Sequence, residues 1–131
     1  MTSSFDKRIF KPNEYLLKEG SPSEAAFLIS SGKVAVRKGE LGPNPQTLAI
    51  LGKGAVVGEM SLFDDLPPIA SAIALEETTT SAISREEFQR RVGSMDPVMR
   101  GIFKIMIERI RAMAEKVEGK PAEVNWSDWK K

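Results

Sequence analysis

The chain has 131 residues, which is the usual size of one domain. Hydrophobic residues make up 41% of it and charged residues 28%, values typical of globular proteins and not of disordered ones. Its formal net charge is only +1, so nucleic acid is no default partner, and the absence of Cys and His excludes disulfides, zinc sites and nucleophiles that depend on His.

No segment of the chain has the pattern of a membrane or export signal. The uncharged apolar stretch from Leu66 to Leu75 contains two prolines and is about half of the ~20 residues that a spanning helix needs. The N-terminal segment from Met1 to Arg8 lacks the apolar core of a signal peptide. We therefore expect a cytoplasmic protein without a membrane partner.

Short apolar runs separated by turn residues fill the chain from about residue 10 to residue 83. They recur about every ten residues, a spacing typical of a β-sandwich or barrel. The predicted strands are Tyr15–Lys18, Ala25–Ile29, Lys33–Lys38, Thr47–Leu51, Ala70–Leu75 and Thr79–Ile83. The Ser31-Gly32 pair between the second and the third strand predicts a tight hairpin in which Gly32 takes a positive φ.

A helix is predicted over about residues 84–92, immediately after the last strand. Ser84 at its start and Glu87 three residues later match the capping-box pattern, and Gly93 follows its end. Asp96-Pro97 then supplies a second N-cap, with proline at the first helical position.

This second, longer helix is predicted over about residues 97–118 and carries two apolar lines. The first line has alternating intervals of four and three residues and consists of Met99, Phe103, Met106, Ile110, Met113 and Val117. The second line, Val98, Ile102 and Ile105, is expected to pack on the β-sheet part of the domain. We therefore expect the first line to form a homodimer interface, because a monomer would leave it in water. The alternatives are that the helix folds back on its own domain, or that Trp126 and Trp129 cover the line.

The segment from Gly54 to Ala72 carries the most specific motif. Gly58-Glu59 opens a short helix, and Pro67-Pro68 leads back into a strand, which predicts a cup of backbone N–H groups suited to an anion. This segment resembles the phosphate-binding cassette of cyclic-nucleotide-binding domains, with the pattern F-G-E-x-A-L-x-x-x-x-P-R-x-A-T. Residues 10–20 and 27–36 resemble the opening strand and turn and the second hairpin of that family.

The resemblance covers about residues 5–118 and implies a mainly β fold with C-terminal α-helices. The implied architecture is a double-stranded β-helix, a jelly-roll-like β-roll of eight antiparallel strands, with short N-terminal helical turns and two C-terminal helices. The domain would then span 1–118, with its β-roll over about 10–83, and 119–131 would be a C-terminal tail.

The resemblance also implies the ligand contacts. Glu59 would accept a hydrogen bond from the ribose 2′-hydroxyl, and Gly58 would let the backbone approach the ligand. The main chain around Met60, Ser61 and Ala70 would face the cyclic phosphate. The ligand-binding residues it implies are Val57, Gly58, Glu59, Met60, Ser61, Pro68, Ile69, Ala70 and Ser71.

Pro68 departs from the family pattern, because it stands where the family has the arginine that neutralises the cyclic phosphate. From Gly54 to Ser84 there is no Lys or Arg, while Glu59, Asp64, Asp65, Glu76 and Glu77 are acidic. Removing one partner of a buried charge pair costs ~2–5 kcal/mol, so we expect cAMP or cGMP to bind no tighter than micromolar. Tighter binding would require a cation from elsewhere, and spacing does not choose among Lys53, Arg37 and Arg85.

The sequence therefore predicts a non-enzymatic regulatory or sensor module that binds a cyclic nucleotide or a related small anionic ligand. It would signal through its C-terminal helix to a second copy or to a protein partner. The alternative is a degenerate domain that no longer binds cyclic nucleotide and serves in dimerisation or protein–protein interaction. No catalytic residue or metal ligand is predicted. No DNA-binding domain is expected, since only residues 119–131 follow the long helix.

Overall fold

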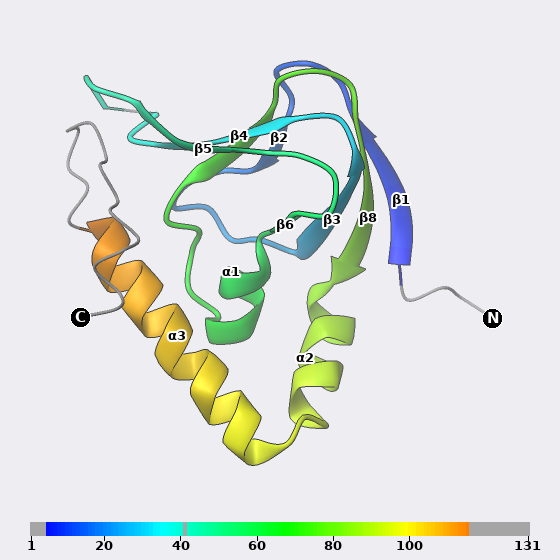
Figure 1. Cartoon of the computed structure of the whole chain (residues 1–131), viewed down its shortest axis with the longest axis vertical. Coiled ribbons are helices and arrows are strands. Elements are labelled where there is room, and N and C mark those ends of the chain that lie inside the picture. The colour runs from blue at the N-terminus through cyan, green and yellow to red at the C-terminus, as the bar shows by residue number, and fades with distance from the viewer. Residues whose placement is uncertain (1–4, 41, 116–131) are drawn as a thin grey trace.

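The structure, a computed structural model, describes residues 5–40 and 42–115 and consists of a β-roll with helices at one end (Figure 1). Two four-stranded antiparallel sheets have the strand orders β1-β8-β3-β6 and β2-β7-β4-β5. The strands are β1 (Phe5–Phe10), β2 (Tyr15–Leu17), β3 (Ala25–Ser31), β4 (Val34–Lys38), β5 (Gln46–Leu51), β6 (Val56–Val57), β7 (Ser71–Ala74) and β8 (Thr78–Ser84). The mainly β roll with C-terminal helices is confirmed.

Strand β1 replaces the predicted N-terminal helical turns. It pairs antiparallel with β8, from Phe5 opposite Ile83 to Phe10 opposite Thr78. The charged run Asp6-Lys7-Arg8 interrupts the apolar alternation that would have revealed this strand in the sequence. Charged side chains suit an edge strand, because they oppose pairing of its free edge with another chain. Strand β6 was not predicted either, since two residues are too few to show a period.

The turn at Ser31-Gly32 is a corner between the two sheets, so the predicted hairpin is wrong. β3 belongs to the first sheet and β4 to the second. The positive φ predicted for Gly32 is confirmed at 104°. A Cβ added to Gly32 would lie 2.6 Å from the Cα of Thr78, where the chain crosses between the sheets a second time. The two crossings therefore pack backbone against backbone, which only glycine permits here.

The core lies between the two sheets. The largest fully buried side chains of the described residues are Ile29, Val34, Leu62, Thr78 and Thr80, of which Leu62 belongs to a short helix beside the sheets. Strand β7 is buried along its whole length, and three of its four residues are small, with Ala72 1% and Ala74 0% exposed. Small side chains on a central strand leave space above the sheet, and the candidate site lies there.

Three helices follow from local signals. The short α1 (Glu59–Asp64) connects β6 to the loop before β7. In α2 (Arg85–Gly93), the Ser84 hydroxyl accepts a hydrogen bond from the Glu87 backbone N–H, which confirms the predicted N-cap. In α3 (Pro97–Glu115), the Asp96 carboxylate accepts from the Val98 N–H at 2.7 Å. Residues 116–131 lie outside the described part of the chain, including Val117, Trp126, Trp129 and the predicted 116–118 end of the long helix.

Helix α3 contacts the rest of the domain mainly through its second half. α2 and α3 diverge from the turn that joins them, and α1 lies between them (Figure 1). Val98, Ile102 and Ile105 are 70%, 45% and 51% exposed, so the prediction that they pack on the β-roll is wrong. The chain leaves α2 at an angle that carries the first turns of α3 away from the sheets. Across the described ranges, no helix combines the length and apolar character that a membrane span requires.

Gly58 and Gly54 provide a matched test of how tightly the start of α1 packs. Both have a left-handed φ, 89° and 92°, so either alanine substitution carries the same backbone strain, about 1–2 kcal/mol. A Cβ at Gly58 would also lie 2.9 Å from Leu17 Cδ2 and 3.0 Å from the Ala25 carbonyl oxygen, whereas nothing lies within 4 Å at Gly54. Gly58→Ala should therefore lower the free energy of unfolding by at least ~1 kcal/mol more than Gly54→Ala in urea titrations. Equal losses would contradict the packing described here.

Candidate ligand-binding site

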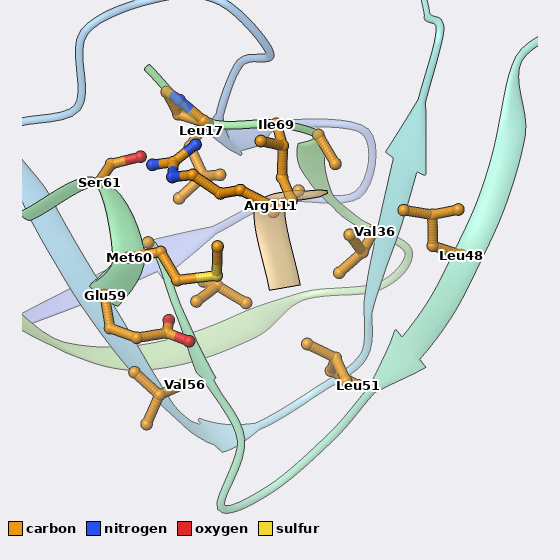
Figure 2. Close-up of a pocket in the computed structure, with 15 residues that line it drawn as sticks. Leu17, Val36, Leu48, Leu51, Val56, Glu59, Met60, Ser61, Ile69 and Arg111 are labelled. Atoms are coloured by element: carbon orange, nitrogen blue, oxygen red, sulfur yellow. The ribbon is translucent and has the colours of Figure 1, made fainter. Parts of the chain in front are cut away.

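A cavity of about 200 Å³ lies beside α1, between the sheets and α3 (Figure 2). Its walls are mostly aliphatic, and Glu59 and Arg111 are its charged lining residues. The lining residues are Leu17, Val36, Leu48, Leu51, Val56, Val57, Gly58, Glu59, Met60, Ser61, Pro68, Ile69, Ala70, Ala72 and Arg111. The cavity thus presents one carboxylate and one guanidinium in an otherwise apolar surface.

Eight of the nine predicted ligand-binding residues line this cavity; they are Val57, Gly58, Glu59, Met60, Ser61, Pro68, Ile69 and Ala70. The ninth, Ser71, does not line it. The Ser71 hydroxyl accepts a hydrogen bond from the Glu19 backbone N–H at 2.9 Å and lines a second cavity, beside Tyr15. Alternate residues of a strand point to opposite sides of the sheet, so Ser71 faces away from Ala70 and Ala72.

Glu59 is the first residue of α1, and its side chain is directed into the cavity (Figure 2). Burial raises the pKa of this carboxyl above its ordinary value, and a hydrogen bond with its own backbone N–H partly offsets that shift. Among residues 5–40 and 42–115, no other group forms a hydrogen bond or an ion pair with this carboxylate. A carboxylate in this position can accept hydrogen bonds from the hydroxyl groups of a ligand.

Arg111 comes from α3, far along the chain from the cassette, and is only 9% exposed. Its guanidinium forms a bidentate ion pair with Asp64: Nε donates to Oδ2, and Nη2 donates to Oδ1 at 2.8 Å. Nη1 donates to the Pro67 carbonyl oxygen at 2.9 Å, and Nη2 also reaches the Leu66 carbonyl oxygen at 3.4 Å. Figure 2 shows the guanidinium directed toward the Ser61 end of the cassette.

The sequence did not reveal Arg111 as a site residue. None of the three candidate cations, Lys53, Arg37 and Arg85, lines the cavity. Arg37 pairs with Glu40 at 3.1 Å, and Arg85 pairs with Asp65. One feature of the sequence could have indicated Arg111. It lies on the same face of the helix as Ile107 and Ala114, at a position where an apolar residue would be expected.

The ion pairs also correct the strongly negative charge expected around the cassette. Asp64 is neutralised by Arg111, and Asp65 by Arg85. Glu76 and Glu77 lie exposed in the turn between β7 and β8, away from the cavity lining. Glu59 is consequently the one carboxylate among the described lining residues, and its charge has no compensating cation there, because Arg111 is already paired with Asp64.

Comparison of the sequence with known proteins identifies a family. The family model described as the cyclic nucleotide-binding domain matches residues 7–94. The chain is 33% identical over 109 residues to the cyclic AMP receptor protein of Thermus thermophilus, covering 83% of this chain and 50% of that protein. It is 28% identical over 100 residues to the cAMP-dependent protein kinase regulatory subunit of Pyricularia oryzae, covering 76% of this chain and 25% of that protein. The chain thus spans half or less of the length of these relatives.

Solved structures agree with the sequence matches. The catabolite activator protein of Thermus thermophilus superposes with a TM-score of 0.69 and 31% identity, over 87% of this chain and 54% of that one. The EAL enzyme Bd1971, in its cAMP-bound form, superposes with a TM-score of 0.76 and 25% identity, over 81% of this chain and 28% of that one. The chain belongs to the cyclic nucleotide-binding domain family.

Proposed function

We propose that the protein is a non-enzymatic regulatory domain whose cavity binds a cyclic nucleotide or a related small anionic ligand. The observation that carries this proposal is the partly buried Glu59 carboxylate, which is aimed into an aliphatic cavity at the start of α1. Both curated relatives above bear the names of regulatory proteins, and the EAL enzyme was solved with cAMP bound. These similarities support cAMP and cGMP as the first ligands to test.

Different lining residues would contact different parts of such a ligand. The Glu59 carboxylate would accept the ribose 2′-hydroxyl, and the left-handed Gly58 allows the backbone to approach closely. Aliphatic side chains such as Val36 and Leu51 would pack against apolar parts of the ligand. Among the described lining residues, no group forms a nucleophile with a paired general base, which supports binding without catalysis.

The second candidate function is a degenerate domain that acts only in association with another chain. Buried Pro68 supports this alternative, because it provides neither the guanidinium of the family pattern nor a backbone N–H. The exposed apolar residues of α3 support association, with Met99 44%, Phe103 38% and Met106 41% exposed. Association and ligand binding are compatible, so each has its own experiment.

Calorimetric titration with cAMP and cGMP tests ligand binding. We expect saturable binding to the wild type and at least tenfold weaker binding to Glu59→Gln, because a neutral amide oxygen accepts a weaker hydrogen bond from the ribose hydroxyl than an ionised carboxylate does. Glu76→Gln is the matched control, since Glu76 is an exposed carboxylate outside the cavity lining, and its affinity should equal that of the wild type. Absence of binding of either nucleotide at millimolar concentration would favour the degenerate domain.

The raised pKa of Glu59 gives the ligand-free protein a specific pH dependence. A carboxyl whose pKa is higher in the folded than in the unfolded state opposes folding when it is ionised, so its unfavourable effect is largest above the folded pKa. Glu59→Gln should therefore be at least as stable as the wild type at pH 7. The difference in stability between Glu59→Gln and the wild type should shrink as the pH falls through the raised pKa of the folded state toward 4.5, the ordinary pKa of a glutamate. A midpoint of thermal unfolding that is lower for Glu59→Gln at pH 7 would instead indicate a stabilising capping role.

Light scattering tests association through α3. We expect a mass of twice the 14.4 kDa of one chain for the wild type, because the exposed apolar surface on the first half of α3 needs a partner. Phe103→Glu should give a folded monomer, whereas Lys104→Glu, at the neighbouring exposed position, should leave the dimer intact. A wild type that remains a monomer across the micromolar range would refute the dimer.

A further inference from the structure

We propose that Arg111 is the residue that binds the anionic group of the ligand. It would thereby provide from α3 the positive charge that Pro68 cannot provide from the cassette. This inference rests on the proposed function, because it requires an anionic ligand in the cavity. It assigns a specificity role to a residue 43 positions away from Pro68 in the sequence.

The position of the guanidinium is the first argument. Its hydrogen bonds to the carbonyl oxygens of Leu66 and Pro67 fix it against the two residues that directly precede Pro68. The same guanidinium lines the cavity together with Pro68 and Ser61. Arg111 therefore delivers a cation to the part of the cassette where the family pattern has its arginine, although it comes from a different element.

The donor capacity of Arg111 is the second argument. A guanidinium has five N–H donors, one on Nε and two on each Nη. Within residues 5–40 and 42–115, its bonds use the Nε donor, one donor of Nη1 and two of Nη2. One Nη1 donor has no acceptor among these residues. The 3.4 Å contact of Nη2 with Leu66 is long enough to be exchanged for a shorter one.

The third argument is electrostatic. The side chains of Arg111 and Asp64 are only 11% and 18% exposed, so their pair is screened much less than a surface pair. Asp64 is not among the lining residues whereas the guanidinium is, so the anionic group of a ligand can contact this cation without approaching its counter-ion. Among the described residues of that wall, Arg111 is the one cation available to a phosphate.

This assignment would couple the ligand to the position of α3. Arg111 joins α3 to the cassette, and the Lys38 ammonium group donates to the Ala114 carbonyl oxygen at 2.8 Å, one turn farther along the helix. A ligand whose anion contacts Arg111 would stabilise the docked position of α3, and by linkage the docked helix would strengthen ligand binding.

Two variants of the ion pair separate ligand binding from a purely structural role. Arg111→Met removes the guanidinium but keeps the aliphatic stem, and Asp64→Asn removes the counter-ion but keeps the guanidinium. If Arg111 binds the phosphate, Arg111→Met should weaken cAMP binding at least tenfold, while Asp64→Asn should leave it unchanged or strengthen it. A purely structural ion pair would instead make both variants lose affinity together, and that result would overturn the inference.

Adenosine and a second arginine provide the controls. Adenosine keeps the base and the ribose hydroxyls but has no phosphate, so its affinity, measured by competition or by calorimetry, should not change in Arg111→Met. Arg109→Met removes an exposed guanidinium from the same helix and should bind cAMP like the wild type. Because Arg111→Met leaves the Asp64 carboxylate without its partner, the double variant Asp64→Asn/Arg111→Met is measured beside it. This double variant should show the same loss of cAMP affinity.

The outcomes distinguish this inference from the proposed function. Unchanged cAMP affinity in both Arg111→Met and the double variant would overturn the role of Arg111 and leave the proposed function intact. Equal weakening of cAMP and adenosine would also overturn it, because the loss would not depend on the phosphate. A wild type that binds neither cAMP nor cGMP would overturn both.

Discussion

The ion pair between Arg111 and Asp64 is the contact on which the relation between α3 and the β-roll depends. The first half of α3 lies largely exposed, and the buried guanidinium, with the Lys38 contact one turn beyond it, fixes the second half. Removing one partner of a buried pair costs about 3–5 kcal/mol because the other charge is left without compensation. A helix whose docking includes such a pair is sensitive to any competing charge in the adjacent cavity.

The chemistry of the cavity follows from the same arrangement. Small residues on β7 leave space above the sheet, α1 directs the Glu59 carboxylate into it, and α3 adds the Arg111 guanidinium. A ligand that satisfies both charged groups needs a hydroxyl donor and an anionic group on one apolar frame. A cyclic nucleotide has this combination, which agrees with the ligand that we propose for this cavity.

Most of the fold and of the cassette could be predicted, because both depend on local patterns. The strand runs and the N-cap at Ser84 follow from short-range spacing, and the resemblance of the cassette to its family implied eight of the positions that line the cavity. The errors come from long-range contacts. Strand β1 is defined by its pairing with β8. The corner at Gly32 is defined by its contact with Thr78, where the chain passes from one sheet to the other a second time. Arg111 meets Asp64 across 47 residues of chain, and no periodicity encodes such a contact.

A crystal structure of the protein with cAMP is the most direct test of the central claim, that a charge carried by α3 completes this ligand site. The account predicts the ribose 2′-hydroxyl on the Glu59 carboxylate, a phosphate oxygen within hydrogen-bond distance of Arg111, and α3 docked against the cassette. A bound nucleotide whose phosphate has no contact with Arg111, or a complex in which α3 has left the cassette, would contradict it.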